Sequence, residues 1–338
     1  MACWVTQEER EGEVQRQLLF IIAAMLWVLL PHFLGRQYID VLVFAGIYAI
    51  SALGVSLLLG YGGMVTLAQS VFYAVGAYTS AYLTTNWSWS VPAGMLFGAI
   101  LSGTIALVIG WPILKFKGYF LAIATLAVAI IANALFYEFD SLTGGAIGIG
   151  GIPKINFFGV LLDSPTHYYY FVWVFLGLCL WLVKNVTESR VGLGVKSMRD
   201  STEAARILGV EVHLLRVQMF VICGVLGSLS GSLFAHYTGY VSVNSFSIEV
   251  SILFLLIPVL GGLSSLYGVV IGALFITFTP VILSKFGELH GVIFGIALVL
   301  LVTLAPKGIF GVYQSLQSRR KRRSNPATEP ATEPATLA

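Results

Sequence analysis

The sequence predicts an all-α membrane protein, a polytopic helical bundle of about ten transmembrane segments. Of its 338 residues, 57% are hydrophobic and only 10% are charged, whereas about 25% of a soluble domain is charged. Residues 41–114 contain no Asp, Glu, Lys, Arg or His, and this stretch is more than three times the ~20 residues that cross a bilayer once. Stretches such as VLVFAGIYAISALGVSLLL are apolar on every face, which argues against the alternating strands of a membrane β-barrel.

Charges, prolines and polar turns divide the chain into the expected spans. They are residues 18–34, 39–59, 63–84, 91–114, 118–137, 167–183, 214–239, 246–261, 266–285 and 289–306. The first lacks a small-residue cleavage site, so we expect a retained helix and not a signal peptide. The turns GYGG and GGLSS are so brief that the segments beside them are candidates for broken or re-entrant helices.

Basic residues predict the orientation, because they concentrate in short cytoplasmic loops. With the N-terminus in the cytoplasm, the loop 115–117, the loop 184–216 and the RRKRR cluster 319–323 all fall on the cytoplasmic side. The loops 138–166 and 240–245 then fall outside, and together they contain a single lysine. Both termini are therefore expected in the cytoplasm.

These assignments define three regions. Residues 1–17 form a cytoplasmic N-terminal segment, residues 18–310 a transmembrane domain with the cytoplasmic loop 184–216, and residues 311–338 a basic and then disordered cytoplasmic tail. A basic cluster just beyond a span is a topology signal, so no nucleic-acid partner is expected. The expected location is a bacterial inner membrane, with lipid as the surrounding partner.

No motif of the chain predicts catalysis or a cofactor site. The glycine-rich stretch 143–153 lacks the Gly-Lys-Ser/Thr ending of a P-loop, and no metal-binding spacing of Cys or His occurs. His236, Glu249 and His290 fall near predicted outer ends, so we interpret them as interfacial side chains and not as a proton relay. The chain is therefore not expected to be an enzyme.

Uncharged polar residues inside spans are the candidates for lining a transport pathway. They are Thr66, Gln69, Thr125 and Asn133. Hydrogen bonding from helix to helix is an equally good explanation of such residues.

The loop 184–216 carries its own helix signals. Asp200 is a candidate N-cap, Glu203 follows it at capping-box spacing, and Gly209 is a candidate C-terminal stop. They predict a short helix over 201–208, about 12 Å long at 1.5 Å per residue. Ala204 and Ala205 would give this helix a smooth face that another protein can approach.

Four motifs occur in an order that is similar to one membrane-protein family. They are LLGYGGMVTLAQSVFYAVGAYTSA, KGYFLAIATLAVAI, SLTGGAIGIGGIP and SFSIEVSILFLLIPVLGGLSSLYGVVIGA, and they cover most of residues 40–310. In this order they resemble the permeases of ABC importers for branched-chain and other hydrophobic amino acids, of the LivM type. The resemblance implies a fold like that of type II ABC importer permeases. Departures from the family pattern, such as Thr66, Gln69, Ser264 and Val269, leave the substrate open.

The resemblance also implies a function and partners. The arrangement of Asp200, Glu203, Ala204, Ala205 and Gly209 looks like the loop by which such permeases dock on their ATPase. The implied complex has a second homologous permease, two ATP-binding subunits that hold the ATP and magnesium, and an extracytoplasmic substrate-binding protein. The implied activity is import of branched-chain or other hydrophobic amino acids by alternating access. Permeases for urea or short amides, an ion-coupled secondary carrier and a non-transporting scaffold are the alternatives.

Overall fold

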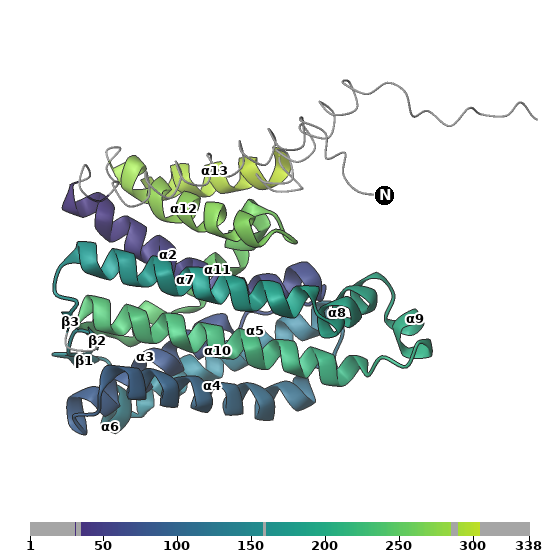
Figure 1. The fold of residues 1–338 in the computed structure, drawn as a ribbon, viewed down its shortest axis with the longest axis horizontal. Coiled ribbons are helices and arrows are strands. Elements are labelled where there is room, and N and C mark those ends of the chain that lie inside the picture. Colours follow the sequence, from purple (N-terminus) through teal and green to yellow (C-terminus); the bar gives the residue numbers. More distant parts are fainter. Residues whose placement is uncertain (1–30, 32–34, 158–159, 285–289, 305–338) are drawn as a thin grey trace, which may run out of the picture.

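The computed structural model describes residue 31 and residues 35–157, 160–284 and 290–304. Its long helices lie side by side in a bundle whose axes run along the horizontal direction of Figure 1. They are α2 (Arg36–Ser56), α3 (Gln69–Asn86), α4 (Val91–Ile113), α5 (Tyr119–Glu138), α7 (Pro165–Glu188), α10 (Val212–Thr238), α11 (Ile248–Gly261), α12 (Leu266–Leu283) and α13 (His290–Leu304). The short elements are the π-helical turn η1 (Leu57–Tyr61), α6 (Asp140–Thr143), α8 (Arg190–Asp200), α9 (Thr202–Ile207), η2 (Val243–Phe246), β1 (Ile149–Gly150), β2 (Asn156–Phe157), β3 (Val160–Leu161) and β4 (Tyr240–Val241).

Every expected span after the first coincides with a long helix. Seven of the described helices are long and apolar enough to cross a membrane. Of the other two long helices, α3 is richer in Ser, Thr and Tyr, and α13 has only 15 described residues. The expected span 18–34 and the segments 1–17 and 311–338 lie outside the described residues. A polytopic helical membrane protein is thus confirmed, while the count of ten stays a prediction.

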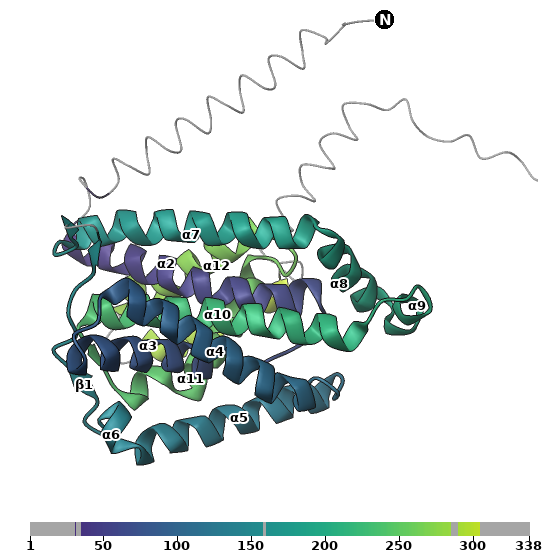
Figure 2. The same ribbon diagram turned by 60° about the horizontal axis from the view of Figure 1, so that its bottom comes forward.

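Helix α2 forms the centre of the bundle and packs against α7, α10, α11 and α12 (Figure 2). Its apolar side chains are buried along most of its length, which fits a helix that is apolar on every face. Glycines allow the neighbouring backbones to touch. A Cβ on Gly76 of α3 would lie 2.1 Å from the Ser228 oxygen of α10, and one on Gly231 of α10 would lie 1.8 Å from the Tyr73 oxygen of α3. The frequent glycines therefore serve close packing, as small residues do between membrane helices.

Two helices begin inside the bundle and not at its surface. The expected span 63–84 is helical only from Gln69, because residues 63–68 have no regular secondary structure. The expected span 246–261 starts in the 3₁₀ turn η2, and α11 begins at Ile248. The two starts meet, since the Ser251 Oγ accepts a hydrogen bond from the Ser70 N–H at 2.8 Å and donates to the Ser70 Oγ at 2.7 Å. Spans beside the brief turns GYGG and GGLSS are thus broken, which is one of the two arrangements that the sequence predicts for them.

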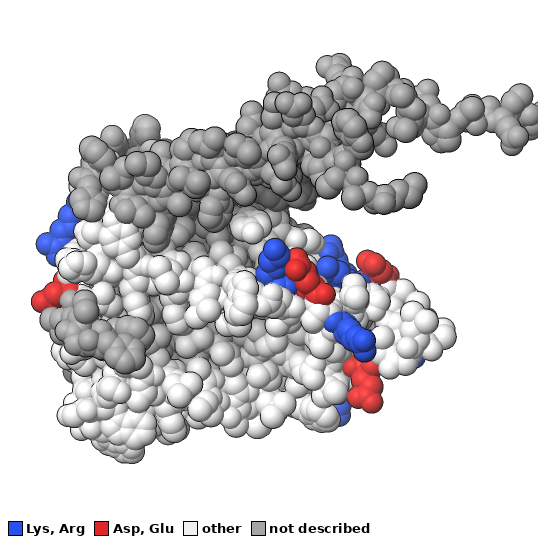
Figure 3. Space-filling view, in the orientation of Figure 1, with Lys and Arg blue, Asp and Glu red and all other residues white. Residues whose placement is uncertain are grey.

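The bundle has two distinct ends. The α8–α9 end carries the connections 62–68, 114–118, 189–211 and 262–265. The β1–β4 end is named for the strand pair Ile149–Gly150 and Tyr240–Val241, which joins the loops that follow α6 and α10. Figure 3 shows charged side chains gathered over α8 and the adjoining end of α7, few at the opposite end, and an uncharged flank between them. The predicted separation of loop 184–216 from loops 138–166 and 240–245 is therefore correct, although the side of the membrane on which each end lies stays a prediction.

Candidate functional site

The short helix α9 projects from the α8–α9 end, where the sequence predicts a docking helix (Figures 1 and 2). Its N-cap is Ser201, whose Oγ accepts a hydrogen bond from the Ala204 N–H at 3.2 Å. Asp200 ends α8 instead, so the expected Asp200 cap and its pairing with Glu203 are wrong by one residue. The reason is that Ser201 has the extended backbone, φ −153° and ψ 111°, that an N-cap adopts.

The C-terminal end of α9 is as predicted. Gly209 has φ +80°, in the left-handed region where a Cβ is strained. The Gly209 N–H donates to the Arg206 carbonyl and the Val210 N–H donates to the Ala205 carbonyl, both at 3.0 Å. This pair of hydrogen bonds is a Schellman motif, which ends the helix abruptly.

The exposed face of α9 differs from the expected one. Ala204 is on the surface, but Ala205 is 1% exposed and belongs to the core of this chain. The expectation that Ala205 contacts a partner is therefore wrong, because its methyl group anchors α9 to the bundle. The apolar groups offered to a partner are Ile207 and Leu208, whose exposed fractions are 86% and 78%.

Arg199, in the last turn of α8, joins the docking helix to the membrane bundle. Its guanidinium donates to the Gly60 carbonyl in η1 and, at 2.9 Å, to the Ser264 Oγ in the turn between α11 and α12. The Tyr61 hydroxyl donates to the Ser264 carbonyl at 3.0 Å. The two backbones are in contact here, since a Cβ on Gly60 would lie 1.6 Å from the Leu263 oxygen. The GYGG and GGLSS turns are thus adjacent, at a π-helical turn of the kind often found at functional sites.

Gln69, a candidate for lining the pathway, is completely buried. Its Nε2 donates to the carbonyl and the hydroxyl of Ser51 on α2, each at 3.0 Å, and its Oε1 accepts from the Cys223 Sγ of α10 at 2.9 Å. The amide therefore links three helices. This geometry favours helix-to-helix hydrogen bonding as the role of Gln69.

Two of the three remaining candidates for lining the pathway also have a structural role. Thr66 is buried and its Oγ1 accepts from the Ala68 N–H at 3.3 Å, while the Thr125 Oγ1 of α5 accepts from the Leu67 N–H at 3.1 Å. Both hold the non-helical segment 63–68 in place. Asn133 is different, because it is half-buried and no hydrogen bond to it is found among the described residues.

The ionisable residues expected at outer ends occupy unlike positions. His236 is buried, with its ring nitrogens 2.7 Å from the Ser80 Oγ and 2.7 Å from the Pro153 carbonyl oxygen, so it ties the β1–β4 end together. The side chain of His290 is not among those described. Glu249 is exposed and stands in the first turn of α11, which starts inside the bundle. The expectation that Glu249 lies at an outer interface is wrong, because that expectation assumed a span without a break.

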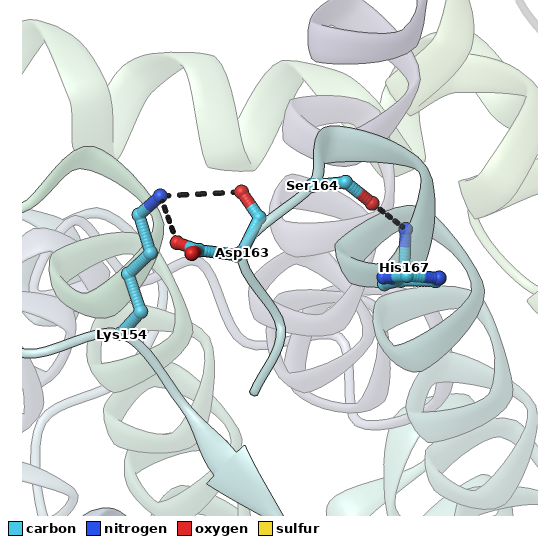
Figure 4. A network of polar contacts seen from close by, with 4 residues as sticks. All are labelled: Lys154, Asp163, Ser164 and His167. Atoms are coloured by element: carbon cyan, nitrogen blue, oxygen red, sulfur yellow. Dashed lines mark hydrogen bonds and ion pairs between the residues drawn. The ribbon is translucent and has the colours of Figure 1, made fainter. Parts of the chain in front are cut away.

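A polar pocket of about 360 Å³ opens at the β1–β4 end. Arg36, Asp40, Lys154, Asp163 and Tyr237 are among its lining residues. The Lys154 Nζ lies 2.6 Å from the Asp163 Oδ1 and donates to the Asp163 carbonyl at 3.2 Å, as Figure 4 shows.

The residue after this pair fixes the start of the next helix. The Ser164 Oγ accepts from the His167 N–H at 3.2 Å and caps α7 (Figure 4). The loop that carries Lys154 and Asp163 is thereby anchored to a long helix, and it gives the β1–β4 end a defined polar surface.

Residues 37–302 match the family described as branched-chain amino acid transport system, permease component. This chain belongs to that family of permeases. The LivM-type resemblance of its motifs is thereby confirmed. The match begins and ends within one residue or two of the described bundle, from α2 to α13.

The permease is similar to curated proteins of two transport systems. It is 28% identical over 323 residues to the high-affinity branched-chain amino acid transport system permease protein LivM of Escherichia coli K12, with 88% of this chain and 76% of the relative covered. LivM of Salmonella typhimurium LT2 is 28% identical over the same shares. The autoinducer 2 import system permease protein LsrC of Escherichia coli O9:H4 is 25% identical over 276 residues, 78% of each chain. No solved structure matches the permease.

The structure singles out three residues whose positions the sequence did not predict. Arg199 was one basic residue among several in its loop, and its contacts with Gly60 and Ser264 join segments far apart in the chain. Ile207 carried a usable signal, because an apolar residue beside a helix-ending glycine in a polar loop calls for a partner. The position of Glu249 could not be predicted without knowing where α11 begins.

Proposed function

We propose that this permease is the membrane-spanning subunit of an ATP-binding-cassette importer for branched-chain or other hydrophobic amino acids. The observation that supports this most directly is α9, a capped helix at one end of the bundle that exposes Ile207 and Leu208 to an absent partner. Exposed apolar side chains on a short rigid helix are typical anchors of a protein interface. Membership in a family of transport-system permeases supports an ATPase as this partner.

The proposed energy coupling passes from α9 to the bundle through Arg199. ATP binding and hydrolysis in two partner ATPases move α9, and the hydrogen bonds of Arg199 carry that movement to η1 and to the turn between α11 and α12. These two segments close the α8–α9 end of the bundle, so shifting them opens the pathway on that side. The α8–α9 end is then cytoplasmic, with both termini on the same side.

The remaining proposed partners are a second, homologous permease and an extracytoplasmic substrate-binding protein. Helix α5 is the exposed edge for the second permease, because only Leu121, Thr125 and Ala129 of its residues are buried. The β1–β4 end, with its Lys154–Asp163 pair, is the surface for the binding protein.

Substrate identity rests on the relatives. LivM is named for branched-chain amino acids and LsrC for autoinducer 2, so the family carries more than one class of solute. The greater identity to LivM favours branched-chain amino acids over autoinducer 2.

The deciding experiment is reconstitution of the permease in proteoliposomes with the proposed ATPases, second permease and binding protein. We expect leucine uptake that requires ATP and every subunit, and no ATP hydrolysis by the purified permease alone. Leucine uptake by this chain alone under a proton gradient would identify an ion-coupled carrier and overturn the proposal. This control is necessary because Glu249 is an exposed carboxyl group in a span that begins inside the bundle, and ion-coupled carriers use such groups.

A further inference from the structure

Glu249 lies at about half the depth of the bundle. It precedes the end of α11 at Gly261 by 12 residues, which corresponds to ~18 Å of helix at 1.5 Å per residue. The turn after Gly261 contacts the end of α2, where the Ser264 Oγ donates to the Gly60 carbonyl at 3.2 Å. Because α2 with η1 has 26 residues and is ~39 Å long, Glu249 stands near its midpoint.

Lateral contacts give the same depth. Ser251, two residues after Glu249, is hydrogen-bonded to Ser70. The neighbouring Gln69 is hydrogen-bonded to Ser51 of α2. Ser51 lies 15 residues from the start of α2 at Arg36 and 10 residues from the end of η1 at Tyr61. The first turn of α11 is therefore level with the middle of α2.

The Glu249 side chain points away from the core. Residues Ser251, Phe254 and Ile257 form the buried side of α11, while Glu249 and Ile252, three positions apart on the helix, are exposed. No described residue forms a hydrogen bond or an ion pair with Glu249. An unpaired carboxyl group facing lipid at mid-depth is expensive, so this face of α11 borders water or a polar partner.

Other polar groups flank this face. The Tyr137 hydroxyl of α5 donates to the Asn244 Oδ1 in η2 at 2.7 Å, and Asn244 is exposed. Asn133 lies one turn before Tyr137 on α5, on the same side of that helix. Asn133 is 14 residues from the start of α5, or ~21 Å, so it lies at nearly the depth of Glu249. Both α5 and η2 lie beside α11, and we name Asn133, Tyr137, Asn244 and Glu249 together the α5–α11 face.

A structural role alone does not account for the carboxyl group. An acidic residue in the first turn stabilises a helix through the dipole, and Glu249 occupies such a position. That gain is available to Ser or Thr at the N-cap without a charge, and it is smaller than the cost of a carboxylate in hydrocarbon. The exposed charge therefore points to a ligand.

We infer that the α5–α11 face lines the translocation pathway and that the Glu249 carboxylate binds the ammonium group of a zwitterionic solute at mid-membrane. This inference rests on the proposed function as an importer. A carboxylate and an ammonium group form a strong, charge-assisted hydrogen bond, and the carboxamide of Asn133 adds neutral donors and acceptors that suit a polar solute. Urea has no ammonium group, so the same face favours amino acids over urea.

The location of Glu249 is tested without any transport assay. In the assembled complex, with Cys3 replaced by serine and with Cys179 and Cys223 buried, Glu249→Cys is treated with a positively charged methanethiosulfonate reagent. We expect rapid modification that leucine slows. Val174→Cys on α7 is the matched control, since Val174 is a 64% exposed apolar residue on the edge of the bundle opposite α5 (Figure 2), and it should stay unmodified. Failure of Glu249→Cys to react would remove this face from the pathway.

The role of the charge is tested with Glu249→Gln, which keeps the size of the side chain. We expect ATP-driven leucine uptake to fall about tenfold or more, as loss of a charged hydrogen bond does. Basal ATP hydrolysis and co-purification of the second permease should be retained, and Glu249→Asp should restore part of the uptake. Glu138→Gln, which removes a carboxylate at the outer end of α5, is the control with unchanged uptake.

Two results of this second experiment overturn the inference. Unchanged uptake with Glu249→Gln would leave the carboxylate with its helix-dipole role only. Loss of the second permease from the complex would make Glu249 an interface residue. If the wild-type complex imports no leucine, the proposed substrate is wrong, and the thiol-modification experiment still decides whether Glu249 borders the pathway.

Discussion

At the scale of single residues, buried polar side chains join helices to one another. The Ser102 hydroxyl donates to the Gly224 carbonyl at 2.9 Å, and the Ser232 hydroxyl donates to the Gly76 carbonyl at 3.0 Å. Gln69 makes the largest such connection, between α2, α3 and α10. Each of these hydrogen bonds contributes only modest free energy in a membrane, so their main effect is to fix the relative positions of the helices.

Gln69→Leu is therefore expected to destabilise the bundle and not to affect transport directly. The substitution leaves the Ser51 hydroxyl and the Cys223 thiol without their partner, at a cost of about 1–3 kcal/mol. Thermal unfolding in detergent should occur at a lower temperature, while uptake per folded complex is unchanged. Cys223→Ser, which keeps a donor for Gln69, should unfold close to wild type. Uptake lost at an unchanged unfolding temperature would restore Gln69 to the pathway.

At the scale of elements, α9 combines a fixed geometry with an exposed apolar end. Ser201 caps its start, the Schellman motif ends it at Gly209, and Ala205 holds it against the bundle. A helix of 6 residues has little stability alone, so these three constraints are what keep it helical. In the proposed mechanism, such a rigid helix transmits movement of a partner to Arg199 and, through Gly60, to the end of α2.

Ile207→Asp is expected to abolish co-purification of the ATPases and ATP-driven uptake. Placing a charge on an apolar anchor of an interface costs about 2 kcal/mol or more, roughly a 30-fold loss of affinity. Ile147→Asp is the control, because Ile147 is 82% exposed at the opposite end and should leave ATPase binding intact. Wild-type ATPase binding by Ile207→Asp would exclude this face of α9 from docking.

At the scale of the whole molecule, two ends of different chemistry are separated by an apolar flank. The α8–α9 end carries most of the described lysines and arginines. The β1–β4 end carries Lys154, Asp163 and the aromatic pair Trp87 and Trp89, which follows the end of α3. Amphipathic rings favour the membrane interface, and basic loops favour the cytoplasm.

Cysteines introduced at Asp163 and at Ser201 should be accessible from opposite sides of the membrane. In intact cells an impermeant thiol reagent is expected to label position 163 and not position 201, with the reverse in inside-out vesicles. The two residues lie in loops at opposite ends of the bundle, so labelling of both from one side contradicts the structure itself.

The sequence by itself determined the architecture and the family. Long runs that are apolar on every face predict membrane helices, because a helix satisfies its backbone polar groups within the segment, and the spacing of basic residues predicts which loops share an end. The left-handed turn at Gly209 was also predictable, since its cause is local.

Only the tertiary structure decided what the polar residues do. Whether Gln69 lines a pathway or joins helices depends on Ser51 and Cys223, which are 18 and 154 positions away. Whether Ala205 or Ile207 faces a partner depends on how α9 lies against the bundle, and the depth of Glu249 depends on where α11 begins. Such facts follow from the packing of distant segments, which local propensity and periodicity do not specify.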